Sequence, residues 1–530
     1  MRRFFSYGPV DRDLHYHAPR EELIDMAYTG LIGENPQKGG HYITVWAPRQ
    51  CGKTWVMQRV NRKIKQSGQF TCGIFTIERG KKIKSEQSMV ELFTEKLTEV
   101  FQVEFPKIKE FKEIPRLFTR SYFQAPVIMI IDEFDALKEE FISDFAAVFR
   151  DMFMTRSNEE NKTSGEKTYL LHGLALVGVR SVLGIENKKG SPFNVQRSLH
   201  IPSLTHEEVT GMFRRYEQES SQKVDDEVID RLFYETAGQP GLTCWFGELL
   251  TETYNRQKDK PLSRINFEEV YAAASYALPN NNILNIISKV KHSPYREWVL
   301  DLFKTGEKID FKFDDTEIGY LYMNGVIDIE KEGLTGYYVR FFSPFVQKRL
   351  FNYFSNELFD YLGRLVEPFE KLDHVIDETG INIRGLMQCY NRYLDKNRDW
   401  LLRDAPRRKD LRIYEAVFHF NLYMYLFQFL KSWGGKVYPE FPTGNGKVDL
   451  IIRYKDRVYG LELKSFTHEA AYKDALSQAA GYGKKLGLEK ISLVFFVEDI
   501  DEKTRKKYEK DFTAKETGVT VETMFITTAS

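Results

Sequence analysis

Residues 46–57 read WAPRQCGKTWVM, and this stretch decides the fold of the first part of the chain. An apolar segment runs into a tight turn that ends in Gly52-Lys53-Thr54, after which a helix is predicted. The backbone N–H groups of such a turn and the positive end of the following helix form a pocket for a phosphate group. We expect Lys53 to reach the β- and γ-phosphates of a nucleotide and Thr54 to ligate Mg²⁺. An ordinary strand-to-helix turn rich in small residues is the alternative interpretation.

Each position of this turn is a candidate contact of the nucleotide. Ala47 stands where the usual phosphate-binding pattern has glycine. Gln50 and Cys51 would contribute backbone N–H groups, so their conformations matter more than their side chains. The expected contacts are Pro48, Arg49, Gln50, Cys51, Gly52, Lys53, Thr54 and Trp55.

A second phosphate-handling segment is predicted over residues 126–137, which read PVIMIIDEFDAL. The apolar run suits a strand buried on both faces of a parallel sheet, and ligands bind at the carboxyl ends of such strands. We expect Asp132 to hold Mg²⁺ through its water shell and Glu133 to position or activate the attacking water. If the two acids only capped a helix that begins near Asp135, one of them would have no role.

The sequence around both segments is similar to that of a known family. Residues 3–57, from RFFSYGPVDRDLHYHAPREELI through HYITVWAPRQCGKTWVM, resemble the start of the AAA-like ATPases of bacteria and archaea, in which alanine at position 47 is normal. The similarity continues through IIDEFDAL and LALVGVRSV, and then through residues 191–213 and 236–246. The resemblance implies a module that binds and hydrolyses ATP with Mg²⁺. It also makes a homo-oligomer possible, because ATPases of this type commonly self-assemble.

Further positions of this module are candidates for nucleotide sensing. His15 and Tyr16 resemble the HY pair of the family, which would flank the adenine. Arg180 directly follows the segment LALVGV and is a candidate for sensing the γ-phosphate or for reaching a neighbouring subunit. An ordinary surface arginine would occupy the same place. The turn Gly238 to Gly241 is either a hinge that opens a set of lid helices or a simple helix-breaking turn.

The first half of the chain is predicted to be an α/β domain with a parallel sheet. Helix-period stretches alternate with short apolar segments, which implies helical crossovers between parallel strands. The expected strands cover residues 43–46, 71–77, 127–131 and 174–179. Residues 155–168, TRSNEENKTSGEKT, lack apolar periodicity and predict an exposed, mobile loop.

Length and composition predict several domains. The 530 residues include 76 Lys and Arg against 76 Asp and Glu, so the basic excess typical of nucleic-acid binding proteins is missing. No apolar run approaches the roughly 20 residues that span a bilayer, and we expect a cytoplasmic protein without a membrane partner. The expected domains are an AAA-like core (1–250), a helical lid or connector (251–290), a winged-helix-like domain (291–355), a helical linker (356–404) and a last α/β domain (405–530).

Residues 294–354 have the order of helices followed by a strand pair that is typical of a winged helix. Such modules contact DNA or serve as spacers between domains. We favour the spacer, because Asp314, Asp315 and Glu317 lie in the candidate recognition segment and would repel phosphates.

The last third of the chain contains a second candidate site. Residues 435–467 alternate as strands do, and side chains two apart on a strand point to the same face, so Glu462 and Lys464 must project together. A hairpin can bring Asp449 beside them. The carboxylates, with the carbonyl of Leu463, would offer hard oxygen ligands to Mg²⁺ or Mn²⁺. Glu415, on the preceding apolar helix, is a further candidate ligand.

The order of these residues resembles the PD-(D/E)XK nuclease superfamily. An acid-bearing helix comes first, then Asp449, then Glu462-Leu-Lys464, and then Gln478 and Tyr482 on a following helix. The resemblance covers about residues 405–500 and implies metal-assisted cleavage of a phosphodiester, in which Lys464 orients the water or stabilises the transition state. The alternative is a surface hairpin, where Glu462 and Lys464 form an ion pair of about 0.5 kcal/mol.

Three functions are compatible with these patterns. In the first, which we favour, the ATPase module controls a nuclease that acts on DNA or RNA, a pairing that would suit defence against phages or mobile elements. In the second, an NTP-driven switch uses the last domain as an inactive docking surface for nucleic acid or protein. In the third, the chain is an ATP-fuelled motor with incidental likeness to nucleases. The substrate, the trigger and the partner proteins are not specified by the sequence.

Overall fold

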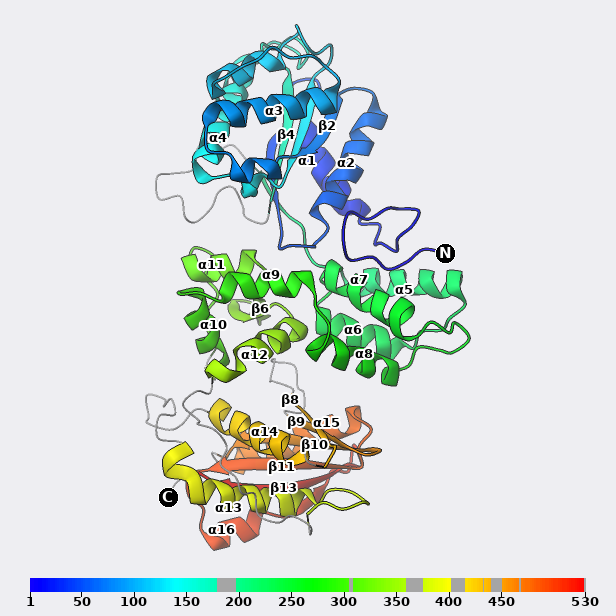
Figure 1. Cartoon of the computed structure of the whole chain (residues 1–530), viewed down its shortest axis with the longest axis vertical. Helices are drawn as coiled ribbons and strands as arrows, with labels where there is room; N and C mark the ends of the chain where they lie inside the picture. Colours follow the sequence, from blue (N-terminus) through cyan, green and yellow to red (C-terminus); the bar gives the residue numbers. More distant parts are fainter. Residues whose placement is uncertain are drawn as a thin grey trace. The chain divides into compact units, whose positions relative to one another are not determined.

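The computed structural model describes residues 1–178, 197–304, 308–358, 375–401, 415–431, 433–439, 450–466 and 469–528 (Figure 1). The chain divides into two compact units. The first unit contains Met1–Lys291 and Asp310–Arg349, and the second contains His292–Ile309 and Leu350–Ser530. The segment predicted as a winged helix is therefore shared between the units. Among the described residues, none of the helices combines the length and the apolar composition that crossing a bilayer requires.

The first unit is built on a five-stranded parallel sheet, which confirms the predicted fold class for this part of the chain. Its strands follow the order β2-β3-β4-β1-β5. The strand β5 was not predicted, because it has only four residues and these are largely polar and mostly exposed. The strands are β1 (Tyr42–Trp46), β2 (Thr71–Thr76), β3 (Val127–Asp132), β4 (Leu171–Gly178) and β5 (Arg197–His200).

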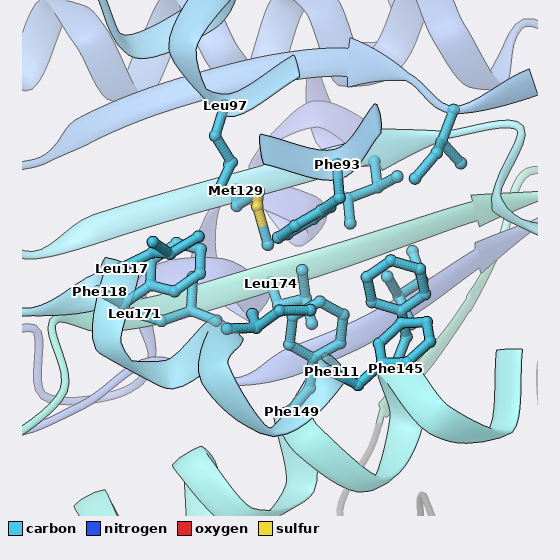
Figure 2. Close-up of a cluster of buried hydrophobic side chains, with 14 of the residues drawn as sticks. Phe93, Leu97, Phe111, Leu117, Phe118, Met129, Phe145, Phe149, Leu171 and Leu174 are labelled. Carbon is cyan, nitrogen blue, oxygen red and sulfur yellow. The ribbon is translucent and has the colours of Figure 1, made fainter. Parts of the chain in front are cut away.

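Helices cover both faces of this sheet. The helices α1 (Glu21–Ile32) and α2 (Lys53–Ser67) pack on one face. The helices α3 (Glu86–Phe101) and α4 (Glu139–Asn158), with the short segment η2 (Phe111–Phe118), pack on the other. Figure 2 shows this second core, where phenylalanine rings of the helices meet Met129 and Leu174 of the sheet. Because both faces are covered, β3 and β4 are apolar and buried along their length.

The expected loop at residues 155–168 begins inside α4, which ends at Asn158, and three of its polar side chains, those of Arg156, Ser164 and Lys167, are buried. Arg156 belongs to α4, and its guanidinium donates hydrogen bonds to Ser164 Oγ at 2.7 Å and to the carbonyl of Tyr169. Ser164 Oγ lies 2.6 Å from Nδ1 of the buried His172, and Lys167 Nζ donates to the carbonyl of Arg156. The prediction of exposure was wrong for these three side chains, because their burial depends on hydrogen bonds, which apolar periodicity does not reveal.

Helices follow the sheet in the chain, and the predicted lid or connector (251–290) covers the last of them. They are α5 (His206–Ser220), α6 (Asp226–Thr236), α7 (Pro240–Glu248), the π-helical η4 (Leu249–Tyr254), α8 (Arg264–Tyr276) and α9 (Asn281–Val290). The winged-helix-like part contains α11 (Thr316–Met323) and the antiparallel pair β6 (Ile327–Glu332) and β7 (Gly336–Phe341). Asp315 caps α11 by accepting hydrogen bonds from the N–H groups of Glu317 and Ile318. This acid therefore has a structural role in the segment.

The second unit contains a six-stranded sheet in the order β12-β13-β11-β10-β9-β8. Strands β8, β9 and β10 are antiparallel neighbours, whereas β10, β11 and β13 are parallel. The strands are β8 (Lys436–Pro439), β9 (Leu450–Tyr454), β10 (Arg457–Ser465), β11 (Lys490–Val497), β12 (Asp511–Thr513) and β13 (Thr520–Thr527). The helices are α10 (Tyr295–Lys304), α12 (Pro344–Leu358, which begins in the first unit), α13 (Ile383–Leu401), α14 (Glu415–Lys431), α15 (Glu469–Lys485) and α16 (Glu502–Tyr508).

Consecutive residues of β11 show which helices cover each face of this sheet. Phe495 stacks on Tyr472 of α15, with ring centroids 5.4 Å apart, and Phe496 stacks on Phe418 of α14 at 5.2 Å. Neighbouring side chains on a strand point to opposite faces, so α15 and α14 lie on opposite sides. The ring of Tyr390 on α13 is 5.1 Å from that of Tyr425 on α14, which places α13 with α14.

We predict that His172 makes the stability of the first unit depend on pH. Burial lowers its pKa from 6.5 to about 4, so between these values the unfolded chain binds a proton that the folded chain does not. The free energy of unfolding should therefore fall as the pH drops from 6.5 towards 4, by at most about 3 kcal/mol from this residue. Denaturant unfolding of His172→Gln should show a smaller slope with pH, and His292→Gln, at an exposed position, should keep the parent slope. An unchanged slope in His172→Gln would contradict the assignment.

Candidate functional sites

The first candidate site lies where β1 ends and α2 begins. The connecting turn places Gln50 and Gly52 at positive φ, 57° and 87°. A Cβ at position 52 would meet no atom within 4 Å, so glycine is required there by the backbone conformation and not by space. The turn leads directly into Lys53, the first residue of α2. The N–H groups at this helix start are the donors that a phosphate would use.

Lys53 points back into the turn. It is only 8% exposed, and its Nζ donates hydrogen bonds to the carbonyls of Ala47 at 2.8 Å and Pro48 at 3.0 Å. A buried ammonium needs such partners. The side chain is thereby held against the loop that is expected to surround the phosphates.

Thr54 at the start of α2 and Asp132 at the end of β3 lie next to each other. Thr54 Oγ1 donates a hydrogen bond to Asp132 Oδ2 at 2.6 Å, although the two residues are 78 positions apart in the chain. Asp132 ends β3 and is buried. A hydroxyl and a carboxylate are the oxygen donors that Mg²⁺ accepts, usually with phosphate oxygens and water as the other ligands. The pair therefore fits a magnesium ion that is bound together with a nucleotide.

Glu133 follows Asp132 in a left-handed conformation, with φ 55° and ψ 35°. Its side chain is half-buried, and burial, followed by the neighbouring charges of Asp132 and Asp135, raises the pKa of its carboxyl group. Its backbone N–H donates to Asp132 Oδ1 at 2.9 Å. The tight turn separates the two acids, so that each can take a different role.

Residues of the Gly238–Gly241 turn contact the turn between β1 and α2. Gln239 Nε2 donates to the carbonyl of Arg49 at 2.9 Å, and the N–H of Gly241 donates to the carbonyl of Gln50 at 3.0 Å. A Cβ on Gly241 would come within 2.6 Å of the Gln50 Cβ, so only glycine permits this approach. Gln50 Nε2 also donates to the carbonyl of Ser6, in the N-terminal segment. Sequence reasoning identified the Gly238–Gly241 turn but missed Gln239 and Ser6 as neighbours of the loop.

Gln239 also caps the helix α7, a role that the sequence does indicate. Its Oε1 accepts a hydrogen bond from the N–H of Leu242 at 2.5 Å and caps α7, which begins with Pro240. A polar residue directly before a proline is a recognised pattern for a helix start. What the pattern does not show is that the same side chain reaches Arg49.

The remaining loop positions have structural contacts. Cys51 is buried, which raises the pKa of its thiol to about 11, so the group is protonated at neutral pH. Trp55 is largely buried and its ring lies 5.4 Å from that of His17. His17 was not a candidate in the sequence, although its ring occupies the side of α2 next to the loop.

His15 and Tyr16 are part of the packing between the N-terminal segment and α5. The ring of His15 stacks on Phe5, with centroids 4.2 Å apart. Tyr16 is buried, and its hydroxyl donates to Glu219 Oε2 at 3.2 Å. Burial and the charge of Glu219 raise the pKa of this hydroxyl. Arg180, the candidate sensor, lies outside the described residues.

In the second unit, Glu462 and Lys464 lie together on β10. Lys464 Nζ is 3.0 Å from Glu462 Oε1, and the side chain of Glu462 is 1% exposed against 31% for Lys464. Glu462 pairs in register with Leu493, which packs under α15, so both charged side chains point to the α15 face. A carboxylate buried in a central strand differs from the solvated ion pair of a surface hairpin.

Two other predicted members of this site cannot be placed. Asp449 and the side chain of Glu415 lie outside the described residues. Gln478 and Tyr482 lie on α15, and Gln478 Nε2 donates to the Tyr482 hydroxyl at 2.8 Å. Within the described parts of both units, no group of three or more His, Cys, Asp or Glu side chains is arranged to hold a metal ion.

Comparisons with known proteins address the first unit. Residues 26–253 match the family described as the AAA-like domain. The chain is similar to a Walker-type ATPase of Pyrococcus abyssi, with 12% identity and a TM-score of 0.44 over 66% of this chain and 99% of that one. The ORC1 protein of Aeropyrum pernix, solved in complex with DNA, is similar with 15% identity and a TM-score of 0.33 over 63% of this chain and 92% of that one. The RuvB Holliday junction branch migration motor of Thermotoga maritima is similar with 11% identity and a TM-score of 0.33 over 67% of this chain and 99% of that one.

The comparison with curated proteins gives no match. The match to the AAA-like family covers the turn between β1 and α2, Asp132, Glu133 and the Gly238–Gly241 turn, but not His15, Tyr16 or the second candidate site. Residues 26–253 are therefore similar to the AAA-like domain family, in line with the resemblance seen in the sequence.

Proposed function

We propose that the protein binds and hydrolyses ATP in its first unit and that this ATPase controls a metal-dependent nuclease in its second unit. The observation that carries the first half is the 2.6 Å hydrogen bond between Thr54 and Asp132 beside the buried Lys53. It joins the two segments that a P-loop ATPase uses for phosphate and magnesium. We infer that this joint is the MgATP site.

Each residue of the ATP site has a proposed role. Lys53 would exchange its two carbonyl partners for phosphate oxygens, and Thr54 and Asp132 would hold the Mg²⁺. The ion, when bound, offsets the negative charge of the phosphates. Glu133, with its raised pKa, would orient the attacking water and accept its proton. His15 and Tyr16, the pair that resembles the HY motif of the family, would flank the adenine.

The lid gives the ATPase a route for control. Because Gln239 and Gly241 bond to the carbonyls of Arg49 and Gln50, a change in the loop on nucleotide binding would strain the lid turn. The lid would then move with the occupancy of the site. A self-assembled form, with Arg180 reaching a neighbouring copy, is a further part of the proposal.

The second half of the proposal rests on the burial of Glu462 beside Lys464. Glu462, with the carbonyl of Leu463, would supply oxygen ligands to Mg²⁺ or Mn²⁺, and Asp449 and Glu415 are proposed to complete the set. The metal, when bound, lowers the pKa of a bound water. Lys464 would orient that water or stabilise the charge on the phosphate. The order helix, three antiparallel strands, helix and parallel strand, from α14 to β11, agrees with the PD-(D/E)XK resemblance.

The substrate would be DNA or RNA. A phosphodiester suits a site that combines a carboxylate-bound cation with a lysine, and the pairing of such a site with an ATPase suits defence against phages or mobile elements. The winged-helix-like part would act as a spacer, in line with the capping role of Asp315.

Lys53→Ala is expected to weaken MgATP binding by about 10- to 100-fold, because the variant loses a charge-assisted contact to the phosphates worth about 1.5–3 kcal/mol. The matched control is Lys65→Ala, which removes an exposed lysine near the end of the same helix. Titration with a fluorescent ATP analogue measures both variants. Equal affinity in Lys53→Ala and the parent would refute the site.

Glu133→Gln is expected to keep MgATP binding and to lower ATP turnover by about 10²- to 10⁴-fold, since the amide cannot accept a proton. Steady-state phosphate release measures turnover, and titration with a fluorescent ATP analogue measures binding. Glu139→Gln, at an exposed glutamate at the start of α4, serves as the control and should turn over ATP at the parent rate.

Lys464→Met is expected to lower nucleic-acid cleavage by about 10²- to 10³-fold, the usual cost of one transition-state donor, and to leave ATP turnover unchanged. The assay incubates the full chain with single- and double-stranded DNA and RNA, with and without ATP, Mg²⁺ and Mn²⁺. Lys473→Met, which changes an exposed lysine on α15, is the control. If the parent yields no cut product in any condition, the nuclease half of the proposal fails, and the inactive docking module takes its place.

A further inference from the structure

A cavity of about 210 Å³ opens in the second unit between α13, α16 and β13. Its wall combines guanidinium groups of Arg384, Arg392 and Arg505 with the apolar side chains of Met387, Met524 and Ile526. Met524 and Ile526 alternate along β13 with Phe525, which packs under α15. They therefore face α13, on the opposite side of the sheet from Glu462 and Lys464. The cavity is separate from the proposed nuclease site.

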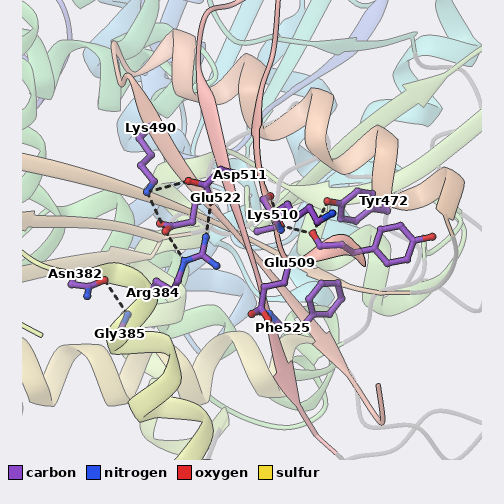
Figure 3. Close-up of polar contacts among 12 residues, drawn as sticks. Asn382, Arg384, Gly385, Tyr472, Lys490, Glu509, Lys510, Asp511, Glu522 and Phe525 are labelled. Carbon is purple, nitrogen blue, oxygen red and sulfur yellow. Dashed lines mark hydrogen bonds and ion pairs between the residues drawn. The ribbon is translucent and has the colours of Figure 1, made fainter. Parts of the chain in front are cut away.

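Two of these arginines are fixed by the protein itself. Arg384 bonds through Nε to Glu522 at 2.9 Å and through Nη2 to Asp511 at 2.6 Å. Figure 3 shows these contacts and those of Lys490 with the same two acids. Arg505 Nη2 donates to the carbonyl of Phe525 at 2.8 Å. The cost of ordering these two side chains is thus met before any ligand arrives.

Glu509 contacts both the strand β13 and Arg505. Its Oε1 accepts a hydrogen bond from the N–H of Phe525, and its Oε2 lies 3.5 Å from Arg505 Nε. Arg505 and Glu509 thereby cover the edge of β13 where its pairing with β12 has ended. Because Arg505 is bound to a backbone carbonyl, its position depends on the strand and not on a mobile loop.

The fixed arginines keep donors that can bind an anion. Each guanidinium has five N–H donors, and the contacts within the described residues leave Nη1 of both Arg384 and Arg505 unused. The lining has three guanidinium groups and one carboxylate, that of Glu509. Asp511 and Glu522 are balanced by Arg384 and Lys490. Arginine also matches the geometry of a phosphate with paired hydrogen bonds.

We propose that this cavity binds a nucleoside phosphate. The phosphate would lie against the arginines and the ring against Met387, Met524 and Ile526, while the exposed Gln388 amide on the rim, which makes no hydrogen bond within the described residues, would meet polar atoms of the ligand. The volume is below the roughly 300–1,000 Å³ of drug-sized pockets, so one nucleotide unit is held. It would come either from a free nucleotide or from the end of a nucleic-acid strand.

Calorimetric titration of the full chain with thymidine 5′-monophosphate in EDTA tests the proposal. Saturable binding is expected, about tenfold weaker in Arg392→Gln, which removes an exposed guanidinium of the wall. Lys396→Gln changes an exposed lysine one turn further along α13, outside the lining, and should bind as the parent does. The readout is binding, so it is independent of any cleavage.

Three further probes assign the ligand. Thymidine and inorganic phosphate should each bind more weakly than thymidine 5′-monophosphate. If a 5′-phosphorylated oligothymidylate binds as tightly as the mononucleotide, the source is a strand end. If the oligothymidylate does not bind, the source is a free nucleotide. The proposal is overturned if thymidine 5′-monophosphate does not bind, if Arg392→Gln binds it as the parent does, or if inorganic phosphate binds equally well.

Discussion

The carboxyl ends of parallel strands lie at one edge of a sheet, and the candidate nucleotide site depends on this constraint. The strands β1 and β3 both pair with β4 and run in the same direction, so the start of α2 and the end of β3 arrive side by side. The Thr54–Asp132 hydrogen bond is the direct consequence. Two apolar cores, one on each face, hold the strands in this register.

The phosphate-binding turn is also held from outside the sheet. Its carbonyls at positions 47 and 48 accept hydrogen bonds from Lys53, and those at 49 and 50 accept them from the lid. Four successive carbonyls of the turn thus have hydrogen-bond partners within the protein. The same contacts that shape the turn also connect it to the lid.

Local patterns were sufficient to predict part of the structure. The segments 46–57 and 126–137 each place an apolar strand before chemically distinctive residues, and a period of two was sufficient to place Glu462 and Lys464 on one face. Burial of Glu462 could not be read from this period, because it depends on α15 covering that face. Ser164 and Lys167 were mispredicted for a related reason, since their burial depends on Arg156 and His172 in other elements. Asp449 and Arg180 remain predictions.

The close approach at Gly241 has a consequence for how the two parts of the ATPase can vary. With the Gln50 side chain filling the space where a Cβ would lie, the turn and α7 have no slack between them. Even a methyl group there would act as a wedge and would push the lid off the loop while leaving every phosphate-binding residue intact. The proposed coupling between nucleotide and lid would therefore depend on the absence of a side chain at position 241.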